Sequence, residues 1–201
     1  MEIFSKIKEI ISKELNVKFD FYENDKYLGI NIHNKSDIFF VIKSLKDNDK
    51  LSFNQLIDIT AIDYPSKQKR FDVVYLLLSM KFNLRILIKT SIFENENIES
   101  ICKIYECANW YERECYDLFG IKFLEHPDLR RILTDYNFEG HPLRKDFPLT
   151  GHNEVRYDEL EKKVVYEEVK LSQEYRDFDY TSPWEGFQNQ LIGDEKANKE
   201  K

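Results

Sequence analysis

A short stretch near the middle of the chain gathers most of its candidate chemistry. In WYERECYDLFGI, residues 110–121, three carboxylates, an arginine and a thiol stand among aromatic side chains. Such a set could serve acid–base catalysis by two carboxylates whose pKa values differ, or attack by a thiol that a neighbouring base activates. An enzyme built on this stretch would use Glu112, Glu114, Asp117 and Cys115.

The residues that would complete such a site are not evident elsewhere in the sequence. The chain has four histidines, and nothing in the sequence places one of them beside Cys115. Their spacing is not that of metal ligands, and no glycine-rich phosphate loop is present. We therefore predict no catalytic, cofactor-binding or metal-binding residue, and keep a stand-alone carboxylate and thiol enzyme as an alternative.

The same stretch has the features of a capped helix over residues 110–119. Asn109 is a good N-cap residue, Glu112 completes a capping-box-like arrangement, and Gly120 suits the left-handed position after the last turn. Asp117 has no such explanation, because the helix dipole disfavours an anion in the last turn. An exposed pair with Arg113 would be worth only ~0.3–0.5 kcal/mol. Asp117 therefore either caps backbone N–H groups within the chain or meets a partner.

Composition limits the classes of function. With 201 residues, of which 42% are hydrophobic, the chain can form one compact domain and a tail. Its net charge of −7 argues against nucleic acid as a partner, because phosphate binding needs a basic surface. The odd number of cysteines, three, indicates a reducing compartment and packing thiols, and excludes a cluster held by four cysteines of this chain.

Apolar periodicity predicts an α+β fold, with helices packed on a mixed, largely antiparallel sheet. Helices are expected near the N-terminus, at 37–46 behind Ser36 as N-cap, at 98–107 and at 110–119. Strands are expected at 17–22, 27–33, 71–79, 82–88 and 164–171, with a turn near Met80 and Lys81. No apolar run approaches the ~18 residues of a membrane span, and we expect a soluble chain.

After Gly120 the character of the sequence changes. Proline and glycine punctuate residues 121–152 and periodic apolar residues are few, which predicts a long extended C-terminal arm. We expect an α+β domain over 1–120, a partner-wrapping arm over 121–192, and a charged, disordered tail over 193–201. An arm of this kind gains stability when it is laid on a partner.

Residues 112–151, with ERE, D, FGI, HPDL, RIL and GHPLRKD in order, resemble the signature region of the C subunit of NADH-quinone oxidoreductase, the respiratory complex I. FNQLIDITAIDYP upstream, and NEVRYDE and YRDFDYTSPWEGF downstream, resemble the same family. The resemblance therefore covers residues 53–187, while residues 1–50 match only in expected architecture.

The resemblance implies a structural subunit that binds no flavin, iron–sulfur cluster or quinone of its own. FMN and the iron–sulfur clusters lie in other subunits of such a complex, which couples electron transfer from NADH to ubiquinone with proton translocation. The implied partners are the D and B subunits of the hydrophilic arm, which form the quinone pocket. Membrane contact would come only through the complex.

The downstream motifs look like the ubiquinone-reducing form that mitochondria share with related bacteria. A peripheral position on the cytoplasmic face of a bacterial inner membrane follows, or on the matrix face of the mitochondrial inner membrane if the gene is in the organelle. A scaffold subunit of a related membrane hydrogenase or ferredoxin-linked complex is the nearest alternative. Residues predicted to contact partner subunits are Glu112, Arg113, Asp117, Gly120, Arg130, Arg131, His141, Pro142, Arg144, Lys145 and Asp146.

Overall fold

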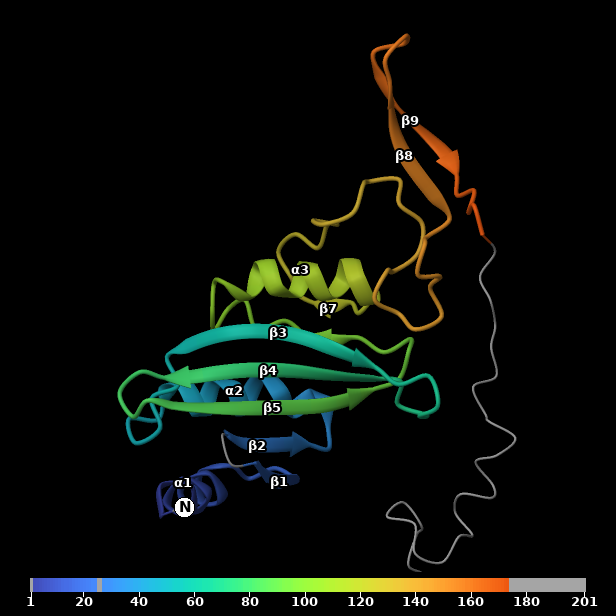
Figure 1. Cartoon of the computed structure of the whole chain (residues 1–201). Helices are drawn as coiled ribbons and strands as arrows, with labels where there is room; N and C mark the ends of the chain where they lie inside the picture. Colours follow the sequence, from blue (N-terminus) through green and yellow to red (C-terminus); the bar gives the residue numbers. More distant parts are fainter. Residues whose placement is uncertain (1, 25–26, 174–201) are drawn as a thin grey trace, which may run out of the picture. The chain divides into compact units, whose positions relative to one another are not determined.

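The computed structural model describes residues 2–24 and 27–173, which fall into two compact units that divide between His152 and Asn153. Figure 1 shows the chain with its elements labelled. Residues 121–152 belong to the first unit by this division. The expected tail over 193–201, and the arm beyond residue 173, lie outside the described residues. The assignment of 121–192 as a partner-wrapping arm stays a prediction.

The first unit opens with helix α1 (Glu2–Glu14), the strands β1 (Phe19–Asn24) and β2 (Tyr27–Ile32), a 3₁₀ turn (Lys35–Asp37) and helix α2 (Ile38–Asp47). These helices and strands agree with those predicted from the spacing of apolar residues. The expected cap of α2 was wrong, because Asp37 is its N-cap residue and makes no side-chain bond there. Asn34 instead caps the preceding 3₁₀ turn by accepting from the N–H of Ser36. The residues that the sequence predicted as the start of α2 therefore form the 3₁₀ turn.

The core sheet has five strands in the order β1-β2-β5-β4-β3, with β3 (Gln55–Asp63), β4 (Phe71–Ser79) and β5 (Leu84–Ile92). β2 and β5 are parallel, and the other pairs in this sheet are antiparallel. Alternating side chains along each strand give the sheet two different faces. The fold is therefore α+β, and the expected hairpin of β4 and β5 is confirmed.

One face of this sheet carries the hydrophobic core. Phe71, Val73, Tyr75 and Leu77 of β4 are fully buried, and so are their neighbours on β5 and β2. The buried side chains of α1 and α2 belong to the same cluster. Figure 1 shows α2 behind the sheet, while no helix of the described residues covers the front. The front face is mixed, with an apolar stripe on β4 between polar side chains of β3 and β5.

The helix expected over 98–107 is absent, and this prediction was wrong. Two residues form strand β6 (Ile98–Glu99), which pairs in parallel with β7 (Phe123–Leu124), and turns lead to helix α3 (Ala108–Phe119). The apolar residues of this loop are buried as a helical face would be. Tertiary bonds replace helical ones, because the Tyr105 hydroxyl donates to the Phe53 carbonyl and the Ile101 N–H donates to Glu112.

Helix α3 lies along β3, the edge strand (Figure 1). The Cys115 thiol is 3.3 Å from the Ile59 carbonyl of that strand and donates to it. An open sheet edge exposes carbonyl groups that invite further pairing, and covering the edge is one way to prevent this. The helix therefore protects the edge of the sheet while it carries the carboxylates of the signature stretch.

The described part of the second unit is a hairpin of β8 (Asn153–Asp158) and β9 (Lys163–Glu168). β9 matches the strand expected at 164–171 in part, whereas β8 was not foreseen. Its residues, NEVRYD, are mostly charged or polar and exposed, so apolar alternation gave little signal. The two strands pair Val155 with Tyr166 and Tyr157 with Val164 on one face of the hairpin.

Candidate functional site

Helix α3 positions the signature residues, and its two ends behave differently from each other. At its start the N-cap residue is Cys107, which makes no side-chain cap, so the predicted capping role of Asn109 and Glu112 was wrong. At its end Gly120 adopts the left-handed conformation with φ of 79°, as predicted, and its N–H donates to the Tyr116 carbonyl. Because Glu112 does not cap the helix, its carboxylate can bond to other groups.

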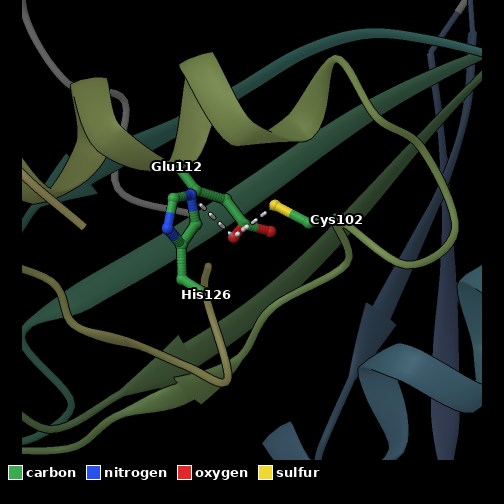
Figure 2. A group of neighbouring side chains, drawn as sticks. All are labelled: Cys102, Glu112 and His126. Atoms are coloured by element: carbon green, nitrogen blue, oxygen red, sulfur yellow. Dashed lines mark hydrogen bonds and ion pairs between the residues drawn. The ribbon is translucent and has the colours of Figure 1, made fainter. Parts of the chain in front are cut away.

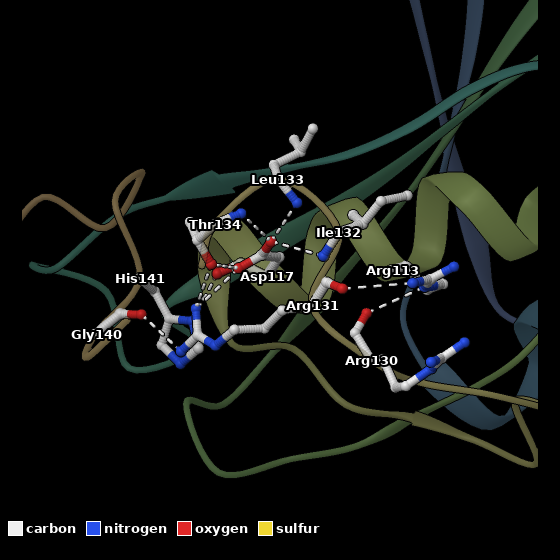
Figure 3. Close-up of polar contacts among 9 residues, drawn as sticks. All are labelled: Arg113, Asp117, Arg130, Arg131, Ile132, Leu133, Thr134, Gly140 and His141. Atoms are coloured by element: carbon white, nitrogen blue, oxygen red, sulfur yellow. Dashed lines mark hydrogen bonds and ion pairs between the residues drawn. The ribbon is translucent and has the colours of Figure 1, made fainter. Parts of the chain in front are cut away.

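Asp117 is the centre of a polar cluster at the C-terminal end of α3 (Figure 3). Its side chain is fully buried, and one carboxylate oxygen accepts from the backbone N–H groups of Ile132, Leu133 and Thr134 at 2.7–2.9 Å. The other oxygen accepts from the Thr134 hydroxyl and from Arg131 Nη1 at 2.8 Å. Asp117 therefore caps backbone groups within the chain, which is the first of the two roles that the sequence left open.

The arginines of the cluster fix the loop 128–141 against the helix. Arg131 reaches from Asp117 to the Gly140 carbonyl, to which its Nη2 donates at 3.0 Å. From the helix side, Arg113 donates to the carbonyls of Arg130 at 3.1 Å and Arg131 at 3.4 Å. Figure 3 shows these bonds on either side of Asp117. The loop is thus held by side chains in place of regular backbone pairing.

The segment after Gly140 returns to the end of α3. The N–H of Leu143 donates to the Leu118 carbonyl at 3.0 Å, and His141 Nδ1 donates to the Asp117 carbonyl at 2.8 Å. Arg144 Nε donates to the Phe119 carbonyl at 2.6 Å. These groups satisfy carbonyls that have no partner inside the helix. A Cβ at Gly120 would meet Arg144 Nη2 at 2.5 Å and His141 Nε2 at 2.6 Å, so glycine is required for space as well as conformation.

A second set of ion pairs joins this segment to the sheet. Asp63, at the end of β3, has a fully buried side chain that accepts from Arg70 Nε at 2.7 Å and from the Lys145 N–H at 2.8 Å. Arg70 also pairs with Asp146 and Glu94, both at 3.0 Å. A buried carboxylate is stable only when it is paired and hydrogen-bonded, and Asp63 meets both conditions. Residues 144–146 are therefore anchored on the sheet.

Electrostatics favour the charged form of both buried aspartates. Burial alone would raise the pKa of Asp117, but the Thr134 hydroxyl and the N–H groups of the 132–134 loop outweigh it and hold this pKa well below its usual range. The Arg70 guanidinium lowers the pKa of Asp63 in the same way. Burial lowers the pKa of His141, and Arg144 and Arg131 lower it further, which keeps its ring neutral.

Glu112 occupies a separate cluster on the N-terminal half of α3 (Figure 2). Its side chain is fully buried, and its carboxylate accepts from the Ile101 N–H at 2.7 Å. Cys102 Sγ lies 3.5 Å from the other carboxylate oxygen, and His126 Nε2 lies 4.0 Å from it. Burial raises the pKa of Glu112, against which the hydrogen bonds of Ser100, Ile101 and Cys102 act.

Cys102, Glu112 and His126 could hold a metal ion by residue type, since their ligand atoms lie within 4.8 Å of one another. The hydrogen bonds of His126 speak against this use. Its Nδ1 accepts from the Asp128 N–H at 3.0 Å and its Nε2 faces the Asn109 carbonyl at 3.2 Å, so the proton belongs on Nε2. A metal at Nε2 would need the other tautomer and would break both bonds. Cys102, Glu112 and His126 therefore fit a hydrogen-bonded cluster better than a metal centre.

The three thiols have no shared site. Burial raises the pKa of Cys102 to about 11 and that of Cys115 well above its usual value, so both stay protonated. Cys107 is exposed at the start of α3. A buried thiol with a raised pKa is a poor nucleophile, because the thiolate is the reactive form.

Known proteins share much of this sequence. The family model for the respiratory-chain NADH dehydrogenase 30 Kd subunit matches residues 32–153, the span that contains α3, both clusters and most of the sheet. The chain is 59% identical to the NADH-quinone oxidoreductase C subunit of Parvibaculum lavamentivorans over 157 residues, 78% of each protein. It is 55% identical to the C subunit of Hyphomonas neptunium over 159 residues, 79% of each.

The chain belongs to the family of the NADH-quinone oxidoreductase C subunit. Its members are subunits of complex I, so partner subunits and a membrane-bound complex follow from membership. A chain of an archaeal respiratory membrane complex, the membrane-bound sulfane sulfur reductase, is similar in structure with a TM-score of 0.62. At 24% identity, over 74% of this chain and 87% of that one, this likeness shows the fold alone. None of the described helices is long and apolar enough to cross a membrane.

Within this member of the C-subunit family, the residues predicted for partner contacts separate into two places. Glu112 lies in the cluster with Cys102 and His126, which sequence reasoning missed. The others lie on α3 after Glu112, at the Gly120 cap, or on the 130–146 segment that packs on the helix: Arg113, Asp117, Gly120, Arg130, Arg131, His141, Pro142, Arg144, Lys145 and Asp146. Their role in contacts with other subunits stays a prediction. Asp63 and Arg70 were also missed, although Asp63 stands in the family-like stretch ITAIDYP.

Proposed function

We propose that this chain is a structural subunit of the proton-translocating NADH:ubiquinone oxidoreductase and carries none of its catalytic groups. On this proposal it braces the quinone-reducing module while electrons pass from NADH to ubiquinone through other subunits. It binds no flavin, iron–sulfur cluster or quinone itself. The observation that carries the proposal is the uncovered face of the central sheet.

That face carries an apolar stripe along β4, flanked by polar residues such as Thr60 on β3 and Lys89 on β5. Val74, Leu76 and Leu78 of β4 alternate with the core residues and are half-buried, and Leu87 pairs with Leu76 on the neighbouring strand. Ile62 on β3 is 40% exposed on the same face. Antiparallel sheets that face water normally place polar residues there, and contiguous apolar surface marks sites of interaction with other proteins. A sheet with one helix-covered face and an apolar stripe on its uncovered face suits a subunit of a larger assembly.

The polar clusters support a structural role for the signature residues. Asp117 and Asp63 are ionised and saturated by partners within the chain, and Glu112 is buried against its loop. A general acid or base must reach a substrate and exchange its proton near the working pH. A depressed pKa and internal hydrogen bonds suit Asp117 to holding the 128–141 loop instead.

The partners in this proposal are the D and B subunits, with the chain peripheral on the cytoplasmic face of a bacterial inner membrane or the matrix face of the mitochondrial one. Support comes from the named relatives, which are NADH-quinone oxidoreductase subunits of bacteria. The alternative of a scaffold in a related complex draws on the fold it shares with a chain of an archaeal respiratory membrane complex. The higher sequence identity to the NADH-quinone oxidoreductase subunits favours the NADH:ubiquinone oxidoreductase over the related complex.

Affinity purification of the tagged chain from membranes tests the proposal. Co-purification of the D and B subunits, with NADH-oxidising activity in the same fraction, is the expected result. Co-purification with hydrogenase or ferredoxin-linked subunits would transfer the scaffold role to the alternative complex. If the purified chain alone binds a flavin or metal, or oxidises NADH, the non-catalytic assignment is wrong. A variant that lacks Cys115 then tells whether the thiol takes part.

A further inference from the structure

Helix α3 presents an exposed Trp–Arg pair on its outer surface. The Trp110 side chain is 62% exposed, and tryptophan is enriched at protein interfaces. The guanidinium carbon of Arg113 lies 5.3 Å from the centre of the Trp110 ring, in cation–π range. The pair is thus preformed on the surface before any partner arrives.

Arg113 is held in place but keeps hydrogen-bonding capacity. Its Nε and Nη2 donate to the carbonyls of Arg130 and Arg131, as Figure 3 shows. Its Nη1 has no acceptor among the described residues, and no carboxylate there lies within ion-pair distance of the group. A guanidinium fixed by two carbonyls loses little freedom when it binds a carboxylate, which favours binding.

The surrounding charges leave this arginine unmatched. Asp128 forms its ion pair with Arg130 at 2.7 Å, and the more distant charge of Arg113 adds to the lowering of its pKa. Glu114, the next residue of the helix, is exposed and forms no ion pair with Arg113 among the described residues. The other arginines of the segment, Arg131 and Arg144, pair with Asp117 and Glu94. Arg113 therefore makes no ion pair among the described residues, although its charge acts on the nearby carboxylate of Asp128.

We infer that Trp110 and Arg113 form a docking site for an acidic segment of a neighbouring subunit, which rests on the proposed function. The segment places a carboxylate on Arg113 and an apolar side chain against the Trp110 ring. Tryptophan and arginine are among the residues most enriched in the energetic centres of protein interfaces. The partner is identified by this chemistry: an Asp or Glu next to an aliphatic or proline residue.

Photo-crosslinking in the assembled complex identifies the occupant. Trp110 is replaced with benzoylphenylalanine in the full chain, the membranes are irradiated, and the linked peptide is sequenced. The expected product joins position 110 to a peptide of another subunit with a carboxylate near the attachment point. The matched control is the same replacement at Phe40 on α2, which is 52% exposed, and it should not yield that peptide. Linkage only to lipid, or to a segment that lacks acidic residues, overturns the inference.

Competition between two tagged chains in one cell measures the strength of the site. The Trp110→Ala chain should enter the complex less than the unsubstituted chain, on the order of 30-fold, and Phe40→Ala should enter equally. Arg113→Lys, which keeps the charge but loses the planar fork, should fall between Arg113→Glu and the unsubstituted chain. Thermal unfolding of each purified chain separates misfolding from lost docking. Equal entry of Trp110→Ala overturns the inference and leaves the proposed function standing, whereas absence of the unsubstituted chain from the complex overturns the proposed function.

Discussion

Replacing Asp117 with alanine should detach the 131–134 loop from helix α3. The substitution removes the acceptor for the N–H groups of Ile132, Leu133 and Thr134, for the Thr134 hydroxyl and for the Arg131 guanidinium. These donor groups are partly buried. Each therefore loses its hydrogen bond to Asp117, and water can replace that bond only after the loop opens.

The magnitude follows from the number and type of these bonds. An unsatisfied buried donor costs about 1–3 kcal/mol, and removing one member of a buried ion pair costs about 3–5 kcal/mol. Because the loop is near the surface, with Leu133 60% exposed, it can admit water and recover part of the loss. We therefore expect a fall in the free energy of unfolding of about 3–5 kcal/mol. Asp117→Asn keeps one acceptor and should lose about half as much.

Urea unfolding of the purified chain measures the loss, and amide hydrogen exchange locates it. Protection should fall at Ile132, Leu133 and Thr134 more than in the central strands. Asp128→Ala, which removes an exposed carboxylate of the same loop, is the control and should leave the midpoint unchanged. Unaltered exchange at the three amides in Asp117→Ala would refute the capping role.

The pH dependence of the loss has a definite sign. The folded-state pKa of Asp117 lies below its unfolded value, so its contribution is present above the unfolded pKa of about 4 and is lost as pH falls through the lower folded value. The difference between the wild type and Asp117→Asn should therefore shrink below about pH 4. A difference that stays constant at acid pH would contradict the charged form of this carboxylate.

Three further predictions concern other parts of α3. Burial raises the folded-state pKa of Glu112, so the stability that its protonated form contributes is full below the unfolded pKa of about 4.3 and is lost as pH rises through the folded value. Glu112→Gln should remove this fall in urea unfolding above about pH 4. Gly120→Ala should destabilise by at least about 1–2 kcal/mol for the left-handed backbone, before Arg144 is displaced, and an unchanged melting temperature would disprove the strain. Cys107 should react quickly with a thiol reagent and Cys115 only after unfolding, and rapid labelling of Cys115 in the folded chain would show that it is accessible.

The sequence predicted the fold class because the periodic elements are simple. β4 and β5 are apolar strands of nine residues each, and their pairing follows from a short connection. The end of α3 was also predictable, since Gly120 is one of few residues that fit a left-handed position. Such features depend on neighbours in the sequence.

Features that depend on distant residues were missed. Residues 98–107 have helical apolar spacing, yet the buried loop takes the same residues into the core through Tyr105 and Glu112. Glu112 was predicted to be a capping residue because nothing in the sequence shows that Ile101 lies beside it. Asp117 was recognised as unexplained, but its partners lie 14–17 residues away in a loop without regular structure. Tertiary hydrogen bonds of this kind leave no local pattern.

We propose that this chain supports assembly of the complex and takes no part in its electron-transfer chemistry. Arg144→Ala removes the donor to the Phe119 carbonyl and a partner of Glu94, and so loosens the segment that packs on α3. In membranes of a strain that carries this variant, the amount of assembled complex and the turnover per assembled complex are measured together. We predict less complex, with unchanged turnover and unchanged apparent KM for NADH in the complex that forms. A normal amount of complex with a specific loss of quinone affinity would contradict the account.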